Sequence, residues 1–307
     1  MASYLLRRLA MAVLVVFGIS LITFAIIYFL PADPARMYAG PNASVAAVER
    51  IRHQLGLDQP LWVQYGRYLE RVFVHGDFGY SYKLQMPVTA AILSRLPNTL
   101  ELIFAAIFVE LAVGLPTGVY AAVRKGRWAD SLSIVLALLG VSAPPFWLGL
   151  LLLYLFGYLL GWLPLGGAGG PQYLILPALT AGLGGAGWYA RMARSSVLEV
   201  LGRDYVRTAR AKGLGEARVI LGHVLRNALN PIITMAGQDV PWFVGNIAVV
   251  EMVFAWPGIG RLAVNAILLD DVPLVMGTVT FAALLVVVAN VLVDLAQALV
   301  DPQIRFD

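Results

Sequence analysis

The chain has 307 residues, of which 60% are apolar and only 13% are charged, with a formal net charge of +4. This balance lies far from that of a soluble globular domain and indicates an integral membrane protein. Because cysteine is absent, a disulfide framework, a thiolate nucleophile and a cysteine-based metal site are all excluded.

The N-terminal part, residues 1–30, is predicted to be a membrane anchor helix. Its apolar run over residues 9–30 meets the roughly 20 residues that a helix needs to cross the hydrocarbon core. The run follows Arg7 and Arg8, exceeds a signal-peptide core in length and lacks a small-x-small cleavage site. We therefore expect the anchor to be retained.

Residues 31–98 are predicted to form an extracytoplasmic segment that folds as a small cap. Large apolar side chains recur there at helical spacing, which favours at least one amphipathic helix. These side chains are Trp62, Tyr65, Tyr68, Leu69, Val72 and Phe73.

Residues 99–299 are predicted to form a core of five further membrane helices, followed by a tail of residues 300–307. The apolar windows are Thr99–Val123, Leu132–Leu160, Leu174–Ala190, Leu229–Phe254 and Val275–Leu299. The expected fold is therefore an all-α polytopic membrane protein with six transmembrane helices. The window Leu174–Ala190, which is the fourth of the six predicted spans, is short and glycine-rich. Its glycines suit close helix packing in lipid. They are Gly182, Gly184, Gly185 and Gly187.

Proline is expected to interrupt the second and third spans, at Pro116 and at Pro144-Pro145. The backbone groups freed by a proline must be satisfied inside the protein or by water in a cavity. A broken helix can therefore mark a pathway, but it can also be a packing kink. The kink is the favoured interpretation at Pro116, whereas both interpretations stay open at Pro144.

Two acidic residues, Glu110 and Asp239, fall deep inside predicted spans. A carboxylate in the membrane is costly and by default faces a bundle interior or a wet cavity. Glu101 and Asp294 lie near helix ends, where interfacial solvation suffices. The candidates for lining a translocation path are accordingly Glu110, Pro144 and Asp239.

Basic residues gather on one side of the predicted spans, which identifies that side as the cytoplasm. They are Arg7, Arg8, Arg124, Lys125, Arg127, Arg305 and eight residues between Arg191 and Arg226. Both termini are therefore expected in the cytoplasm. The seven basic residues of the 31–98 segment do not change this orientation, because long loops translocate largely regardless of charge.

The cytoplasmic region 191–228 is predicted to contain a short helix, a glycine hinge and a second helix. Asp204 suits the helix start and Gly213 suits the left-handed residue that closes a helix. Arg203, Arg207 and Arg210 form one stripe of the first helix, and Val206 and Ala209 form another. The second helix, from Gly215 to about Asn227, has an apolar face that is expected to pack on the ends of the spans. That face comprises Ala217, Ile220, Leu221, Val224, Leu225 and Ala228.

The residues alone leave the use of this region open. It could dock a soluble partner, lie in the lipid headgroup layer, or be a basic loop that satisfies only the positive-inside bias.

This region closely resembles the cytoplasmic loop of binding-protein-dependent ABC importer permeases, in the version found in dipeptide, oligopeptide, glutathione and nickel importers. Ala209 and Gly213 keep the spacing of the Glu-Ala-Ala-x3-Gly motif, and the stretch 204–213 is followed by His223 and by residues 225–228. Other matching segments are Tyr4–Leu9, Pro31–Pro34, Leu55–Pro60, Gly76–Ser81, Gly161–Pro164 and Trp256–Arg261. The resemblance covers essentially the whole chain, and its last motif, together with the outer segment, is similar to the first, B-type permease of such systems.

The resemblance implies a type I importer permease fold in a bacterial or archaeal plasma (inner) membrane. It also implies four kinds of partner, which are a second homologous permease, two ATP-binding subunits, an extracytoplasmic substrate-binding protein and the lipid bilayer. The ATPase-coupling helix would comprise Tyr205, Val206, Arg207, Thr208, Ala209, Arg210, Ala211, Lys212 and Gly213, supported by His223, Arg226 and Asn227. ATP and Mg would be bound by the partner ATPase subunits, and no cofactor or metal is expected in this chain. Its three lysines all lack the preceding glycine of a phosphate loop, so the chain itself is not expected to be an enzyme.

The sequence departs from the general importer pattern at a few positions. Arg207 and Thr208 replace Glu-Ala, Arg226 replaces proline, and Ala32 replaces glycine in Pro-Gly-Asp-Pro. The peptide and nickel branch tolerates the first two changes. Asp239 lies where relatives commonly carry an apolar residue, so the resemblance does not support a role for it.

Three other functional classes compete with this assignment. An intramembrane serine protease is set aside, because the three histidines lie outside the spans and no Gly-x-Ser-Gly sequence occurs. An ion-coupled secondary transporter could use Glu110 and Asp239, but it does not account for the coupling motif. A scaffold without transport is the third. The expected substrates are peptides, dipeptide, oligopeptide or glutathione-like, with nickel chelates as the alternative.

Overall fold

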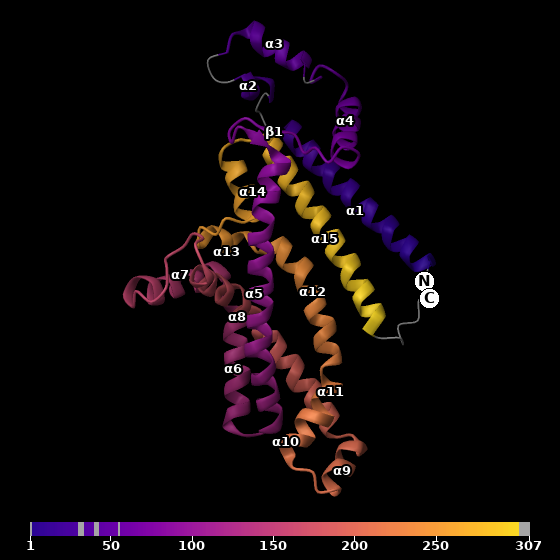
Figure 1. The fold of residues 1–307 in the computed structure, drawn as a ribbon, viewed down its shortest axis with the longest axis vertical. Helices are drawn as coiled ribbons and strands as arrows, with labels where there is room; N and C mark the ends of the chain where they lie inside the picture. The colour runs from indigo at the N-terminus through magenta and orange to yellow at the C-terminus, as the bar shows by residue number, and fades with distance from the viewer. Residues whose placement is uncertain (1, 30–33, 40–42, 55, 301–307) are drawn as a thin grey trace. The chain divides into compact units, whose positions relative to one another are not determined.

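The computed structural model describes residues 2–29, 34–39, 43–54 and 56–300, and it is helical there apart from one small hairpin (Figure 1). The predicted all-α class is therefore correct. Parts of three sequence predictions lie outside the described residues: the motif at residues 31–33, Leu55 in the motif at 55–60, and the tail beyond Val300. The chain divides into two compact units. Unit 1 comprises Met1–Pro97 and Gly258–Val291, and unit 2 comprises Asn98–Pro257 with the end of α15 from Leu292.

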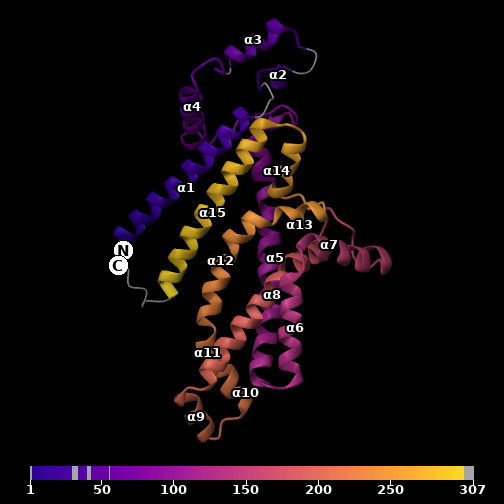
Figure 2. The same cartoon turned by 180° about the vertical axis from the view of Figure 1, so that it is seen from behind.

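Unit 1 is built around two long helices, α1 (Ala2–Phe29) and the first part of α15 (Val272–Val300), which run side by side in both views (Figures 1 and 2). The predicted anchor and last span are thus helices, each slightly longer than expected. The short helix α4 (Leu61–Phe73) is tied to both by tyrosine hydroxyl groups. Tyr65 is 2.8 Å from the Ser20 hydroxyl on α1, and Tyr68 is 2.7 Å from the Thr280 hydroxyl on α15.

The predicted amphipathic helix of the outer segment is α4, but its buried face is narrower than expected. Tyr68 and Val72 are buried, whereas Trp62 is 76% exposed and Phe73 is 47% exposed. Four-residue steps through positions 64, 68 and 72 define the buried stripe, so Trp62 and Phe73 point away from it. Gln64, a polar residue absent from the predicted face, is buried within the stripe.

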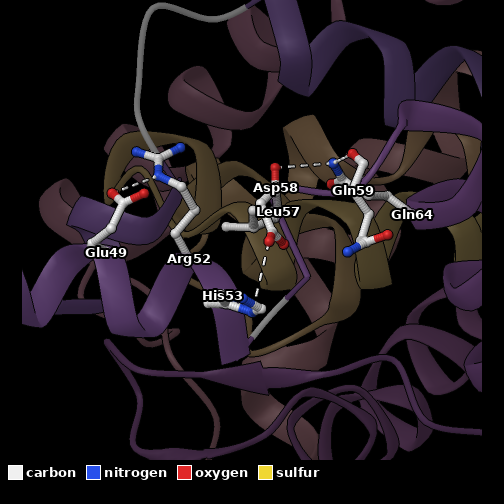
Figure 3. Close-up of polar contacts among 7 residues, drawn as sticks. All are labelled: Glu49, Arg52, His53, Leu57, Asp58, Gln59 and Gln64. Carbon is white, nitrogen blue, oxygen red and sulfur yellow. Dashed lines mark hydrogen bonds and ion pairs between the residues drawn. The ribbon is translucent and has the colours of Figure 1, made fainter.

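Gln64 stabilises the turn between α3 (Val45–Gln54) and α4. Figure 3 shows its polar contacts with this turn. Its amide group donates hydrogen bonds to the Gln59 carbonyl at 2.7 Å and to the Leu57 carbonyl at 3.2 Å. Gly56 has φ +66°, and the bonds from Gly56 N to the His53 carbonyl and from Leu57 N to the Arg52 carbonyl close α3 as a Schellman motif. Before α3 lies the short helix α2 (Pro34–Ala39).

A hairpin of two two-residue strands, β1 (Tyr80–Ser81) and β2 (Met86–Pro87), leads directly into α5 (Val88–Val123). The helix therefore begins eleven residues before the membrane span that was predicted from Thr99. The early turns form because Val88, Ala91 and Ile92 bury against α14 (Ile259–Leu268) and α15 in the core of unit 1. Helix α14 was not predicted, since it lies in what was expected to be a loop.

Helix α5 runs without a break through Pro116, so the expected interruption there is wrong. Pro116 has no N–H group, so the Ala112 carbonyl loses its usual helical donor. The neighbouring Thr117 hydroxyl donates a hydrogen bond to the Val113 carbonyl at 2.6 Å, which adds a side-chain bond in the turn that the proline weakens.

In unit 2, α5 packs closely on α8 (Pro171–Leu201) through small residues. A Cβ atom on Gly114 would lie 2.5 Å from the Ala186 carbonyl and from Tyr189 Cβ, and one on Gly182 would lie 2.5 Å from the Ala106 carbonyl. The predicted packing role of the glycine-rich span is correct at Gly182. Its length was underestimated, because α8 has 31 residues and continues past Ala190 to Leu201.

The predicted break at Pro144-Pro145 is confirmed. Helix α6 (Trp128–Ser142) ends before it, Pro144 is extended, and Pro145 occupies the first position of α7 (Pro145–Leu152), where a missing N–H group has no cost. The chain continues as a π-helix, η1 (Leu153–Leu159).

The fifth predicted span, Leu229–Phe254, is also made of two helices, α12 (Asn230–Asn246) and α13 (Ala248–Val253). Backbone hydrogen bonds to and from Ile247 bridge the interruption between them.

Two of the described helices are long and apolar enough to cross a membrane by themselves. They contain the stretches Val88–Val123 and Val272–Gln297. Shorter apolar helical stretches occur at Ala10–Ala25, Pro145–Leu159 and Ile259–Leu268.

Candidate functional site

The predicted short helix of the polar region is α9 (Asp204–Ala211), at one end of unit 2 in both views (Figures 1 and 2). Val206 is 0% exposed and Ala209 is 5% exposed. Both pack in one cluster with Ala122 at the end of α5 and Val197 near the end of α8. Helix α9 is therefore seated on the ends of the long helices by its apolar face and does not project freely.

The opposite face of α9 is exposed and mostly polar. Its residues are Tyr205, Arg207, Thr208, Arg210, Ala211 and Lys212, followed by Gly213. Asp204 is a first-turn acid rather than the N-cap, which is Arg203 without a side-chain capping bond. Gly213 has φ +80° and no atom within 4 Å of a Cβ built on it, so its backbone conformation rather than space requires glycine.

The two exposed arginines of α9 differ in how firmly they are held. Arg210 forms a bidentate pair with Glu216, in which Nη2 lies 2.6 Å from Oε1 and Nε lies 3.1 Å from Oε2. This pair raises the pKa of Arg210 and lowers the pKa of Glu216. Arg207 has only a 3.5 Å contact with Asp204, so its guanidinium group is the freer of the two.

The predicted second helix is present, but it contains a π-helical segment that shifts its apolar face. It comprises α10 (Glu216–Arg218), η2 (Val219–Val224) and α11 (Leu225–Ala228). The five-residue step of a π-turn places Val219 and Val224 in the core cluster with Ala228. Ala217 and Leu221, which a regular 3.6-residue period would bury, are exposed.

The three expected support residues, His223, Arg226 and Asn227, are all exposed. The Asn227 side-chain amide donates a hydrogen bond to the His223 carbonyl at 3.0 Å, which links successive turns of the same segment. These residues therefore present a polar surface beside α9, while Val219, Val224 and Ala228 provide the packing beneath it.

Glu110 and Asp239 come from different helices, α5 and α12, and the structure brings their carboxyl groups together. Tyr189 of α8, which the sequence analysis missed, donates a hydrogen bond from its hydroxyl group to Asp239. Pro144, the third pathway candidate, is instead exposed at the break between α6 and α7. Among the described residues, no three His, Cys, Asp or Glu side chains gather as metal ligands.

A second polar network in unit 2 involves Trp256 and Pro257, the first two residues of the motif at 256–261. The indole group of Trp256 donates to the Asn98 carbonyl at 2.9 Å, and the Asn98 side-chain amide donates to the Pro257 carbonyl at 2.9 Å. Next to Asn98, the Thr99 hydroxyl donates to Glu251, which is 0% exposed. The motif therefore fastens the chain after α13 to α5.

Two family descriptions match the chain. "Binding-protein-dependent transport system inner membrane component" matches residues 114–306, and the N-terminal part of such membrane components matches residues 1–103. The chain belongs to this family of permeases. It is consequently a membrane component of an ABC transport system and not itself the ATPase.

Full-length relatives support the same assignment. The permease is 44% identical over 315 residues to a "Putative peptide transport system permease protein" of Brucella abortus (strain 2308), with 100% of both chains covered. It is 42% identical over 306 residues to the "Glutathione transport system permease protein GsiC" of Escherichia coli (strain K12), again with 100% of both covered.

The fold of the permease is also found in solved structures. It is similar to a chain in an inward-facing structure of the MetNI methionine ABC transporter, with a TM-score of 0.57 and 21% identity. The similarity covers 68% of this chain and 95% of that chain. The family match decides against the scaffold and ion-coupled alternatives that the residues left open.

Proposed function

We propose that the protein is the permease of an ATP-driven importer of peptides, including glutathione-like peptides, and forms half of its translocation pathway. The full-length similarity to permeases named for peptide and glutathione transport carries the substrate class. In this proposal six transmembrane helices cross the inner membrane with both termini in the cytoplasm. A second permease, two ATP-binding subunits and an extracytoplasmic binding protein complete the importer.

The same proposal divides the chain into an anchor at 1–30, an extracytoplasmic segment at 31–98, a permease core at 99–299 with its coupling region at 191–228, and a cytoplasmic tail at 300–307. Orientation rests on the charge distribution, because the basic clusters flank the predicted cytoplasmic ends of the spans.

We further propose that α9 is the element through which the ATPase acts on the permease. The observation that supports this role is that α9 has one buried apolar face and one exposed face. Val206 and Ala209 are buried against α5 and α8, so a movement of α9 is transmitted to both helices. Apart from Tyr205, the exposed residues are polar or small, which suits a protein groove better than insertion into lipid.

On this face, Arg207 is the residue expected to reach acidic or polar groups of the ATPase. Arg210 is held by Glu216 and is expected to shape the end of α9 rather than to contact the partner directly. Val206 and Ala209, which the sequence motif also places in the coupling helix, do not contact the partner but hold α9 on α5 and α8.

The test is uptake and ATP hydrolysis by the importer reconstituted in vesicles with its ATPases and binding protein. Arg207→Glu reverses a charge on the exposed face of α9 and is expected to abolish peptide uptake. Arg218→Glu, which makes the same charge change on exposed α10, is the matched control and is expected to leave most uptake intact.

The two parts of the proposal fail separately. Full uptake by Arg207→Glu at normal expression would overturn the coupling role of α9. ATP-dependent uptake by the unaltered complex that no dipeptide, oligopeptide or glutathione reduces in competition would overturn the substrate class.

A further inference from the structure

The carboxyl group of Glu110 is buried between α5 and α8 with an unsatisfied oxygen atom. Glu110 is 3% exposed, and its Oε2 atom accepts no hydrogen bond from an N–H or O–H donor in the described part of the chain. A buried carboxylate oxygen without a donor is costly, because burial removes the hydrogen bonds that solvent gives it at the protein surface.

The position of this carboxyl group is enforced by the helix it faces. A Cβ atom on Gly185 of α8 would collide with Glu110 Oε1 and with the carboxyl carbon. Glycine at 185 therefore leaves the space that the Glu110 side chain fills.

The polar neighbour of Glu110 is the carboxyl group of Asp239, within hydrogen-bonding distance. Two ionised carboxylates at this separation repel each other and have no proton to place between them. One proton on the pair supplies the missing donor and removes the repulsion. Tyr189 adds a hydroxyl donor to Asp239, so the carboxylate that stays ionised is stabilised from the other side.

No basic side chain acts on this pair among the described residues. The groups that act on Asp239 are Glu110 and Tyr189. On α8, Arg191 stacks over the Trp188 ring at 4.2 Å, and Arg194 is paired with Asp130 of α6. On α15, which packs on α12 through Val293, the ionisable group is Asp294, a further acid.

A metal cation is a poorer occupant than a proton. Calcium takes six to eight oxygen ligands and magnesium takes six. No third His, Cys, Asp or Glu side chain joins the pair within the described residues.

We infer that Glu110 and Asp239, with Tyr189 as donor, form an internal proton-binding site of the permease, in which one proton is shared by the two carboxyl groups. The proton comes from solvent and leaves the pair with one negative charge instead of two. It enters from the side of Asp239, which is only half-buried, whereas Glu110 is closed off. This inference is independent of the substrate and of the role of α9.

The test is infrared spectroscopy of the full-length permease in lipid nanodiscs at pH 7, where an exposed Glu or Asp is ionised. The protein is expected to show the C=O stretching band of a protonated carboxylic acid, shifted by exchange into heavy water. Glu110→Gln and Asp239→Asn are each expected to remove the contribution of the pair, which lowers the intensity of the band. Both substitutions keep the shape of the side chain, and the amide of either new residue supplies the donor that the proton supplied.

The matched control is Glu101→Gln, at an exposed position of the same helix, which is expected to leave the band unchanged. Absence of the band in the unaltered protein at pH 7 would overturn the inference. A band of unchanged intensity in both Glu110→Gln and Asp239→Asn, or one that Glu101→Gln weakens equally, would overturn it as well.

Discussion

Asp130 and Arg194 form a bidentate ion pair that joins α6 to α8. Arg194 Nε lies 2.6 Å from Asp130 Oδ1, and Arg194 Nη2 lies 2.8 Å from Asp130 Oδ2. The Gly126 N–H group donates a further hydrogen bond to Asp130 Oδ2 at 3.1 Å, so the same carboxylate also fixes the turn between α5 and α6. Three helices of unit 2 are thus connected at one buried acid.

We predict that Asp130→Asn lowers the thermal unfolding midpoint of the permease. Asparagine retains the size of the side chain but loses the charge, which leaves the Arg194 guanidinium group without its partner. The measurement is thermal unfolding of the purified protein in detergent, followed by tryptophan fluorescence. Asp270→Asn, at an exposed acid in unit 1, is the control. Equal midpoints for the Asp130 and Asp270 variants would contradict the prediction.

The pH dependence of this effect follows from the pKa of Asp130. Side-chain hydrogen bonds from Arg194 lower it from an ordinary value of 3.8 to about 2. A lowered folded-state pKa gives stability that is fully present above the unfolded-state pKa and is lost as pH falls through about 2. The difference in midpoint between the native protein and Asp130→Asn is therefore expected to be the same at pH 5 and at pH 8. A difference that vanishes by pH 5 would show that the pair is not formed.

We predict that Gly118→Ala destabilises the contact between α5 and α8. A Cβ atom at Gly118 would collide with the Ala190 carbonyl and would lie 2.7 Å from Ala193 Cβ. The helices must separate to admit it, at a cost of about 1–3 kcal/mol, which is typical of overpacking. Gly245→Ala in α12 is the control, because no atom lies within 4 Å of a Cβ there. The free energies of unfolding of the two variants decide the matter, and equal values would argue against close packing at Gly118.

We predict that Thr99→Val destabilises unit 2. Thr99 donates its hydroxyl proton to Glu251 at 2.8 Å, and both residues are buried. Valine keeps the shape but removes the donor, which costs about 1–3 kcal/mol because a buried acceptor loses its hydrogen bond. Thr208→Val, at an exposed threonine of α9, serves as the comparison in the same unfolding experiment. The prediction fails if Thr99→Val unfolds like the native protein.

Hydrophobic periodicity was sufficient to predict the long helices α1, α5 and α15 and the amphipathic face of α9. It was insufficient where a local backbone irregularity changes the period. In η2 the five-residue turn buries Val219 in the core and leaves Leu221 exposed. The residue types there do not distinguish a π-turn from an α-turn. Helix α14 was missed because its apolar residues are too few for a membrane span, although Ile259, Leu262 and Ala266 keep helical spacing.

The interior site shows a different limit of sequence reasoning. The depth of Glu110 and Asp239 within their helices followed from hydropathy, but their pairing depends on how α5 and α12 pack. A signal for the third member was available on α8. Gly185 and Tyr189 are four residues apart and therefore on one helix face, which contacts both acids. Arg210 was expected to be free to contact a partner, but it is paired with Glu216. The sequence does not reveal this pair, because the two side chains meet only through the turn at Gly213.

We predict that Gly213→Val disrupts the end of α9 and uncouples ATP hydrolysis from uptake. Gly213 has φ +80°, a conformation that costs a residue with a Cβ atom roughly 1–2 kcal/mol and a β-branched residue more. The strain is relieved if the turn opens, which releases the Arg210–Glu216 pair and the position of α9 on Val197 and Ala122. Gly215→Val is the matched control, because Gly215 has an ordinary φ of −62° and open space around it. In reconstituted vesicles, the importer that contains Gly213→Val is expected to hydrolyse ATP without peptide uptake, whereas the importer that contains Gly215→Val retains uptake. Coupled uptake by Gly213→Val at normal expression would show that the left-handed turn does not position α9 for its partner.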